Sequence, residues 1–223
     1  SSPAVADGMV FFGSKDNYLY AVDVKTGQEK WKFKTEGFVN SSPAVADGMV
    51  FFGSKDNYLY SVDVKTGQEK WKFKTEDNVF SSPAVADGMV FFGSWDNYLY
   101  AVDVKTGQEK WKFKTKGSVD SSPAVADGMV FFGSWDNYLY AVDVKTGQEK
   151  WKFKTKDDVF SSPAVADGMV FFGSLDNYLY AVDVKTGQEK WKFKTEDWVT
   201  SSPAIADGMV FFGSWDNYLY AIK

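Results

Sequence analysis

The sequence contains no cysteine and no histidine. The absence of cysteine excludes disulfides, thiol nucleophiles and iron–sulfur ligation. The absence of histidine removes the commonest general base, the histidine-dependent catalytic triads and the usual zinc sites. No apolar run approaches the roughly 20 residues that a membrane-spanning helix needs. These absences exclude a large share of enzyme classes and indicate that the chain has no membrane partner.

The residues that are present predict a soluble, folded chain. Hydrophobic residues make up 44% of the sequence and aromatic residues 18%, which is too apolar for a disordered protein. The net charge of −5 argues against nucleic acid as a partner, because nucleic-acid binders normally carry a basic surplus. Residues 1–8 show neither the charged nor the apolar region of a targeting segment, so none is expected.

The sequence consists of near-identical tandem repeats. The repeat units are 1–40, 41–80, 81–120, 121–160, 161–200 and the incomplete unit 201–223. A unit that recurs at a fixed period forms one small structural element, and such elements bury their faces by stacking on one another. We therefore expect residues 1–223 to form a single domain.

One unit reads as four short strands. In the second unit the strands are expected at 42–46, 49–52, 58–62 and 69–75, separated by turn residues. The dipeptide Asp47-Gly48 favours a two-residue hairpin turn. The last strand alternates Trp71 and Phe73 with lysines, the pattern of a protected edge strand, whereas the small residues of the first strand suit a crowded place where sheets converge.

A unit of about 40 residues with four antiparallel strands is the period of a β-propeller blade. The predicted fold class is all-β, a six-bladed propeller of four-stranded blades whose last blade has three strands. A β-sandwich and an open β-solenoid are the alternatives. The sandwich gives no reason for near-identical copies, and the solenoid leaves two aromatic faces exposed.

The residues from Ala21 to Trp31 follow the pattern A-x-D-x-x-T-G-x-x-x-W, which recurs in every complete unit, with Ser61 replacing alanine once. This pattern resembles the docking motif of PQQ-type propeller repeats, found in quinoprotein dehydrogenases and in assembly lipoproteins of the BamB kind. The resemblance implies that each motif tryptophan packs on the glycine turn of the next blade and donates its indole N–H there. Proteins of the family that it resembles usually lie outside the cytoplasm, but the sequence itself assigns no compartment. The structural docking residues are Trp31, Trp71, Trp111, Trp151 and Trp191.

The resemblance does not carry enzyme chemistry with it, because one fold hosts unrelated functions. Dehydrogenases of this kind have eight blades, a calcium ion, a catalytic aspartate and often a cysteine pair. The present chain has fewer units, no cysteine and no insertion that makes one copy unique. We predict no enzyme activity, no cofactor and no metal site. The repeated pair Asp16-Asn17 is interpreted as turn capping rather than as part of a calcium ring.

The copies differ almost only at two places, which a four-strand meander brings to the same end. These are the turn between the second and third strands and the link between units. Aromatic residues there suit a sugar, a peptide or a protein loop. The alternative is that the loops drifted, or were varied deliberately, and their aromatics pack on adjacent loops. The candidate binding face comprises Lys15, Lys55, Trp95, Trp135, Leu175 and Trp215 in the turns, and Phe38, Asn78, Ser118, Asp158 and Trp198 in the links.

The last unit ends after its third strand. We expect the ring to close by face packing between the sixth and first units, giving a monomer. The alternative is a strand-exchanged oligomer in which the edge 218–222 captures another strand. The near identity of the units indicates recent amplification or design. The function expected is that of a non-catalytic scaffold or binding module. The alternatives are a binding propeller that uses the tryptophan-bearing loops and a PQQ- and calcium-dependent dehydrogenase.

Overall fold

The computed structural model describes all residues from Ser1 to Lys223, and its regular structure consists of strands alone. No helix is present that is long and apolar enough to cross a membrane. The chain divides into two compact units, Ser1–Lys112 and Phe113–Lys223.

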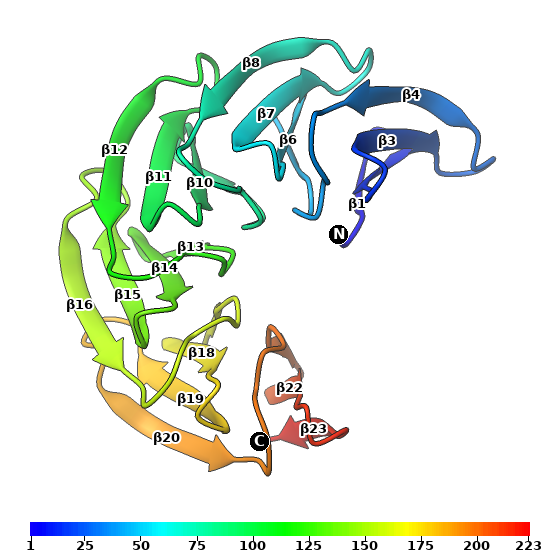
Figure 1. The fold of residues 1–223 in the computed structure, drawn as a ribbon. Helices are drawn as coiled ribbons and strands as arrows, with labels where there is room; N and C mark the ends of the chain where they lie inside the picture. Colours follow the sequence, from blue (N-terminus) through cyan, green and yellow to red (C-terminus); the bar gives the residue numbers. More distant parts are fainter. The chain divides into compact units, whose positions relative to one another are not determined.

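The strands form six sheets, each a meander in which neighbours along the chain pair in antiparallel fashion (Figure 1). The first sheet contains β1 (Ala4–Ala6), β2 (Met9–Gly13), β3 (Tyr18–Asp23) and β4 (Glu29–Lys34). The second contains β5 (Ala44–Ala46), β6 (Met49–Gly53), β7 (Tyr58–Asp63) and β8 (Glu69–Lys74). The third contains β9 (Ala84–Ala86), β10 (Met89–Gly93), β11 (Tyr98–Asp103) and β12 (Glu109–Lys114).

The remaining sheets belong to the second unit. The fourth contains β13 (Ala124–Ala126), β14 (Met129–Ser134), β15 (Tyr138–Asp143) and β16 (Glu149–Lys154). The fifth contains β17 (Ala164–Ala166), β18 (Met169–Gly173), β19 (Tyr178–Asp183) and β20 (Glu189–Lys194). The sixth has three strands, β21 (Ala204–Ala206), β22 (Met209–Gly213) and β23 (Leu219–Ile222). The predicted architecture of five four-stranded sheets and one three-stranded sheet is confirmed.

The hairpin between the first two strands has the predicted two-residue turn. Ala46 pairs with Met49, and the intervening Asp47 and Gly48 have φ angles of 51° and 72°. Two successive positive φ angles match the right-handed twist of the flanking strands. The first strand itself is shorter than predicted and begins at Ala44, after Pro43, which has no backbone N–H to offer a sheet.

The sheets converge at their first strands. Within each unit the backbones of successive first strands approach one another, β1 with β5 and β5 with β9, then β13 with β17 and β17 with β21. The fourth strands of neighbouring sheets make no such approach. Small alanines in the first strands allow this crowding, so each sheet is a wedge, narrow at its first strand.

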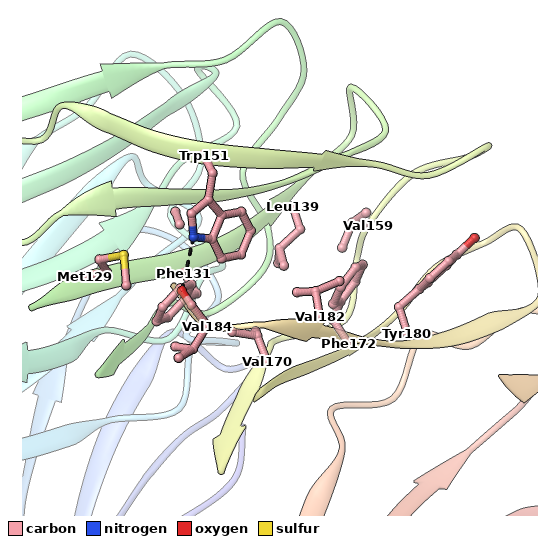
Figure 2. Packing of buried hydrophobic residues seen from close by; sticks show 11 residues of the cluster. Met129, Phe131, Leu139, Trp151, Val159, Val170, Phe172, Tyr180, Val182 and Val184 are labelled. Atoms are coloured by element: carbon pink, nitrogen blue, oxygen red, sulfur yellow. Dashed lines mark hydrogen bonds between the residues drawn. The ribbon is translucent and has the colours of Figure 1, made fainter. Parts of the chain in front are cut away.

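The hydrophobic core lies between sheets rather than within them. In the compact unit Phe113–Lys223, Phe131, Leu139 and Trp151 of the fourth sheet pack against Phe172 and Val182 of the fifth (Figure 2). The same arrangement joins the first sheet to the second and the second to the third. A sheet alone therefore has no core, and its stability depends on its neighbours.

Candidate binding surface

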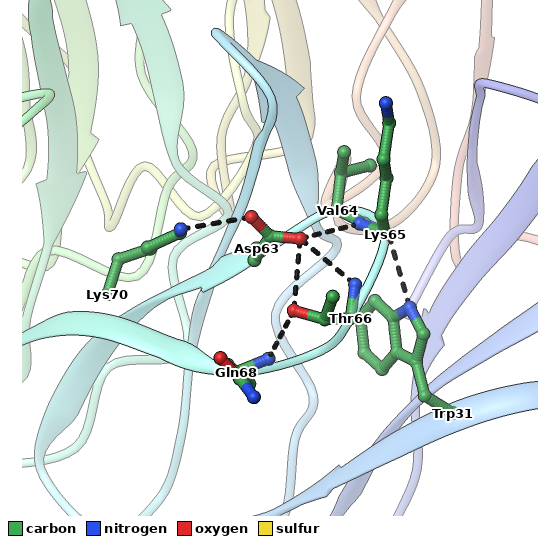
Figure 3. A network of polar contacts seen from close by, with 7 residues as sticks. All are labelled: Trp31, Asp63, Val64, Lys65, Thr66, Gln68 and Lys70. Carbon is green, nitrogen blue, oxygen red and sulfur yellow. Dashed lines mark hydrogen bonds and ion pairs between the residues drawn. The ribbon is translucent and has the colours of Figure 1, made fainter.

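One end of each four-stranded sheet is built around the aspartate of the docking motif, as Figure 3 shows for the second sheet. Asp63 Oδ1 accepts hydrogen bonds from the backbone N–H of Lys65 and Thr66 and from Thr66 Oγ1, at 3.0, 3.0 and 3.1 Å. Its other oxygen pairs with Lys70 Nζ at 3.0 Å. The lysine and the turn donors lower the pKa of Asp63 to about 2. The carboxylate thus fixes the turn that follows β7.

The motif tryptophan joins that turn to the preceding sheet. Trp31 Nε1 donates to the carbonyl oxygen of Val64 at 3.1 Å, and its ring lies so close to Gly67 that a Cβ there would sit 2.7 Å from ring carbons. Trp71 and Trp151 donate in the same way to Val104 and Val184. Trp111 and Trp191 occupy the equivalent positions on β12 and β20. The indole hydrogen bonds of Trp31, Trp71 and Trp151 each join one sheet to the next.

The loops that vary among the copies lie together at the other end of each sheet. Thr35 N donates to Asn17 O, and Val39 N donates to Ser14 O, which ties the link after β4 to the turn between β2 and β3. Lys55 N then donates to Phe38 O at 2.9 Å, which ties the turn of one sheet to the link before it.

The same backbone bond recurs along the chain and always joins two residues that vary among the copies. The turn residue donates and the residue of the preceding link accepts, with nitrogen–oxygen distances of 2.9–3.0 Å. The further pairs are Trp95 with Asn78, Trp135 with Ser118, Leu175 with Asp158 and Trp215 with Trp198. The candidate residues predicted from turns and links are therefore direct neighbours in pairs. Lys15 lies in the turn of the first sheet, and no link precedes that sheet in the sequence.

Their side chains also contact residues of the links. Lys55 Nζ lies 5.4 Å from the centre of the Phe38 ring. The ring of Trp95 contacts Phe80, with centroids 4.8 Å apart, and that of Trp135 contacts Phe160 at 4.5 Å. Part of the aromatic surface of Trp95 and Trp135, which the sequence suggested for binding, thus packs against neighbouring loops.

The pair formed by Trp198 and Trp215 leaves two tryptophan side chains exposed. The two rings lie 5.3 Å apart, and Trp215 Nε1 donates to Thr200 Oγ1 at 2.9 Å. Trp215 remains 60% exposed and Trp198 42%. Trp95, Trp135 and Leu175 are only partly exposed, as are Asn78, Ser118 and Asp158. In the compact unit Ser1–Lys112, Phe38 is 39% exposed, and Lys15 and Lys55 are exposed.

Asp158 is the one candidate whose ionisation is disfavoured. Burial raises its pKa, and the negative charges of Asp157 and Asp136 raise it further. This position therefore suits a cationic or hydrogen-bond-donating group better than an anionic one.

Residue-by-residue interpretation of the sequence missed part of this arrangement. Phe80, Phe160 and Thr200 are the last residues of their links, and each contacts a turn tryptophan. All three stand at a position that varies among the copies, and this variation was the available signal.

The aspartates of the variable turns are engaged locally. Asp56 Oδ2 accepts from Tyr60 Oη at 2.9 Å and from the backbone N–H of Glu36 at 2.9 Å. The equivalent aspartates accept in the same way, for instance Asp176 from Tyr180 and from Lys156 N. No group of three or more acidic side chains in the chain is arranged to hold a metal ion.

Wedge-shaped four-stranded meanders that share inter-sheet cores and a tryptophan dock define a β-propeller of PQQ-type repeats, as predicted. The family profile described as outer membrane protein assembly factor BamB matches residues 1–80, 74–160 and 136–223, so the chain belongs to this family. No curated protein matches the sequence.

Two solved structures share the fold over the whole chain. One is the crystal structure of BamB from Moraxella catarrhalis, with a TM-score of 0.88 and 18% identity, covering 100% of this chain and 72% of that one. The other is the computationally designed Ika8 protein, with a TM-score of 0.89 and 22% identity, covering 99% of this chain and 69% of that one. At these identities the likeness concerns the fold alone.

Proposed function

We propose that this chain is a non-catalytic binding scaffold whose ligand contacts the variable loops of the compact unit Phe113–Lys223. The ligand class is a peptide or an exposed protein loop, and the contact centres on Trp198 and Trp215. The remaining blade surface serves to hold these loops in place.

The observation that carries the proposal is the exposure of two neighbouring indoles on blades that are otherwise nearly identical. The rings of Trp198 and Trp215 contact each other and leave much of their surface to solvent. Tryptophan is the residue most enriched among binding hot spots, because it offers a large rigid apolar surface and one N–H donor.

A protein ligand is favoured over a small molecule. The family is described by a role in protein assembly, and Trp198 and Trp215 remain 42% and 60% exposed. Near Trp198 and Trp215, Glu196, Asp197 and Asp216 add negative charge, so we expect a ligand with basic and apolar side chains.

The test begins with peptide and glycan arrays probed with the whole chain, followed by titration of the best ligand. The variant carrying Trp198→Lys and Trp215→Lys is expected to lose at least about tenfold in affinity. The matched control is Val5→Lys, which changes a residue that is 65% exposed on β1, outside these loops. It should bind like the parent chain.

Equal binding by the double variant and the parent would contradict the proposed site. A glycan in place of a peptide among the specific ligands would keep the site and correct the ligand class. Saturable binding of PQQ and calcium with alcohol oxidation would contradict the non-catalytic assignment and favour the dehydrogenase.

A further inference from the structure

The links between sheets differ from one another in the charge of their first residue. That residue is Glu36, Glu76 and Glu196 in three links, and Lys116 and Lys156 in the other two. Both lysines lie in the compact unit Phe113–Lys223, one repeat apart.

A groove lies beside Lys156, between the fourth and fifth sheets. Its volume is about 520 Å³, which is within the range of small-molecule sites. Lys154 and Lys156 line it from the end of β16 and the link that follows, and Lys192 lines it from β20. Glu189 is the one acidic residue in the lining. The lining therefore carries an excess of two positive charges.

The backbone at Lys156 is held in place by the fifth sheet. Lys156 N donates to Asp176 Oδ2 at 2.9 Å, and the same oxygen accepts from Tyr180 Oη at 2.7 Å. The side chain of Thr155 adds a hydrogen bond from its Oγ1 to Asn137 O at 2.9 Å. The ammonium group of Lys156 thus extends from a fixed point, which lowers the ordering cost of binding.

Two aromatic rings give the groove an apolar part. Phe153 and Tyr180 both line it, with ring centroids 5.2 Å apart. Lys192 Nζ lies 5.7 Å from the centre of the Tyr180 ring and 3.4 Å from Glu189 Oε1. Because both side chains of this ion pair are well exposed, the pair is weak and Lys192 can turn to a stronger acceptor.

The preceding link repeats the arrangement. A groove of about 300 Å³ lies beside Lys116, and the rings of Phe113 and Tyr140 line it. Its charged residues are Lys114, Lys116, Lys152 and Glu149.

The links that begin with glutamate have balanced charges at these positions. Between the first and second sheets the equivalent residues are Lys34, Glu36, Glu69 and Lys72. Two lysines and two glutamates leave no net charge there. The excess of positive charge therefore depends on the lysine at the start of the link.

We propose that each of the two grooves beside Lys116 and Lys156 binds a phosphate monoester. Such a group carries a charge of about −1.5 to −2 at pH 7 and three strong acceptor oxygens. It matches an excess of two positive charges and three ammonium donors, which a carboxylate or a sulfate ester with a single charge does not. The rings of Phe153 and Tyr180 suit an aromatic ring or a sugar that carries the phosphate. These grooves are separate from the loop pair of Trp198 and Trp215, so either proposal survives the failure of the other.

The probe is phenyl phosphate, titrated into the full chain and monitored by the NMR shifts of the backbone amides of Lys116 and Lys156. Saturable shifts are expected at both amides. The matched control ligand is phenyl sulfate, which has the same shape and one negative charge, and it should bind at least about tenfold more weakly. Glucose 6-phosphate is titrated in parallel. Tighter binding of phenyl phosphate points to a phosphorylated aromatic side chain, and tighter binding of glucose 6-phosphate points to a sugar phosphate.

The protein variants exchange the charge of the link. Lys156→Glu introduces the residue that three other links have at this position, so the fold accommodates it. It should weaken binding in its own groove at least about tenfold and leave the groove beside Lys116 unchanged. Glu76→Lys should create a third site between the second and third sheets.

The control variant is Lys145→Glu, which makes the same change in net charge at an exposed position in a docking turn. Both grooves should bind phenyl phosphate as in the parent chain. Absence of saturable shifts, equal affinity for phenyl phosphate and phenyl sulfate, or unchanged binding by Lys156→Glu would overturn the proposal. So would an equal loss in Lys145→Glu, because binding would then follow the overall charge of the chain.

Discussion

The hydroxyl of Ser61 is a single polar group in an otherwise apolar core. It is completely buried on β7, and its hydroxyl has no hydrogen-bond partner. The other complete sheets have alanine in its place, buried equally well. An unpaired hydroxyl in an apolar core destabilises a fold, because its hydrogen bonds to water are lost without replacement.

We expect Ser61→Ala to stabilise the chain by about 1–2 kcal/mol. Urea denaturation measures the change, and the reverse substitution Ala101→Ser provides the control, which should destabilise by a similar amount. A destabilising Ser61→Ala would show that the hydroxyl has a partner in solution.

The motif aspartates make stability depend on acid. The pKa of Asp63 is lowered to about 2 from an ordinary value of 3.8, first by Lys70 and then by the Thr66 backbone. The stabilisation is therefore fully present above pH 3.8 and is lost as the pH falls through about 2. Asp23, Asp103, Asp143 and Asp183 behave alike.

The thermal midpoint should consequently fall between pH 4 and pH 2, and Asp63→Asn should reduce that fall. Lys70→Met, which removes the first cause of the lowered pKa, should also reduce it. A midpoint that depends on pH equally in the parent and in both variants would contradict this assignment.

Single residues were predictable where local chemistry decides. The hairpin at Asp47-Gly48 followed from the dipeptide alone. The pairing of Trp215 with Trp198 did not, because the bond between turn and link crosses from one sheet to the next. Only the folded chain shows which link a turn contacts.

At the level of elements, the contact between tryptophan and glycine turn is the recurring joint between sheets. A Cβ at Gly107 would lie 2.7 Å from ring carbons of Trp71, whereas one at Gly88 would meet nothing within 4 Å. Both glycines have positive φ angles, 69° and 72°. Comparing the same substitution at Gly88 and at Gly107 therefore separates the cost of backbone strain from the cost of disturbing the contact with Trp71.

We expect Gly88→Ala to cost about 1–2 kcal/mol from backbone strain alone. Gly107→Ala should cost about 1–3 kcal/mol more, because the ring of Trp71 must also move. Chemical denaturation of the two variants gives the difference. Equal losses would show that the joint tolerates displacement and adds little to stability.

The strands themselves were largely predictable because alternation and turn residues recur so regularly. The register shift between Ser61 and Val62, where β7 and β8 pair irregularly, was not. Nothing in the alternation of Trp71 and Phe73 with lysines specifies an extra residue.

At the scale of the whole molecule, stability is shared between neighbouring sheets. Val50, Phe52 and Val62 of the second sheet are completely buried by the sheet before it. Their counterparts in the first sheet, Val10, Phe12 and Val22, are partly exposed. In an array with nearest-neighbour cores, less covered sheets open more readily.

Native-state hydrogen exchange should therefore be graded along the chain. Amides of β2 and β3, and of β22 and β23, should exchange at lower opening free energies than those of β6 and β7 or of β18 and β19. Uniform protection across all six sheets would contradict this distribution.

The central claim is that the variable loops confer binding on uniform blades, and loop exchange tests it most directly. Asn78→Trp with Phe80→Thr makes the link before Trp95 identical to residues 196–200, and Trp198→Asn with Thr200→Phe makes the reverse change. The measurement is the dissociation constant of the peptide ligand for each chain. We predict at least about tenfold weaker binding by the chain with the reverse change alone, and recovery when both changes are combined. Unchanged affinity in the chain with the reverse change alone would contradict the account.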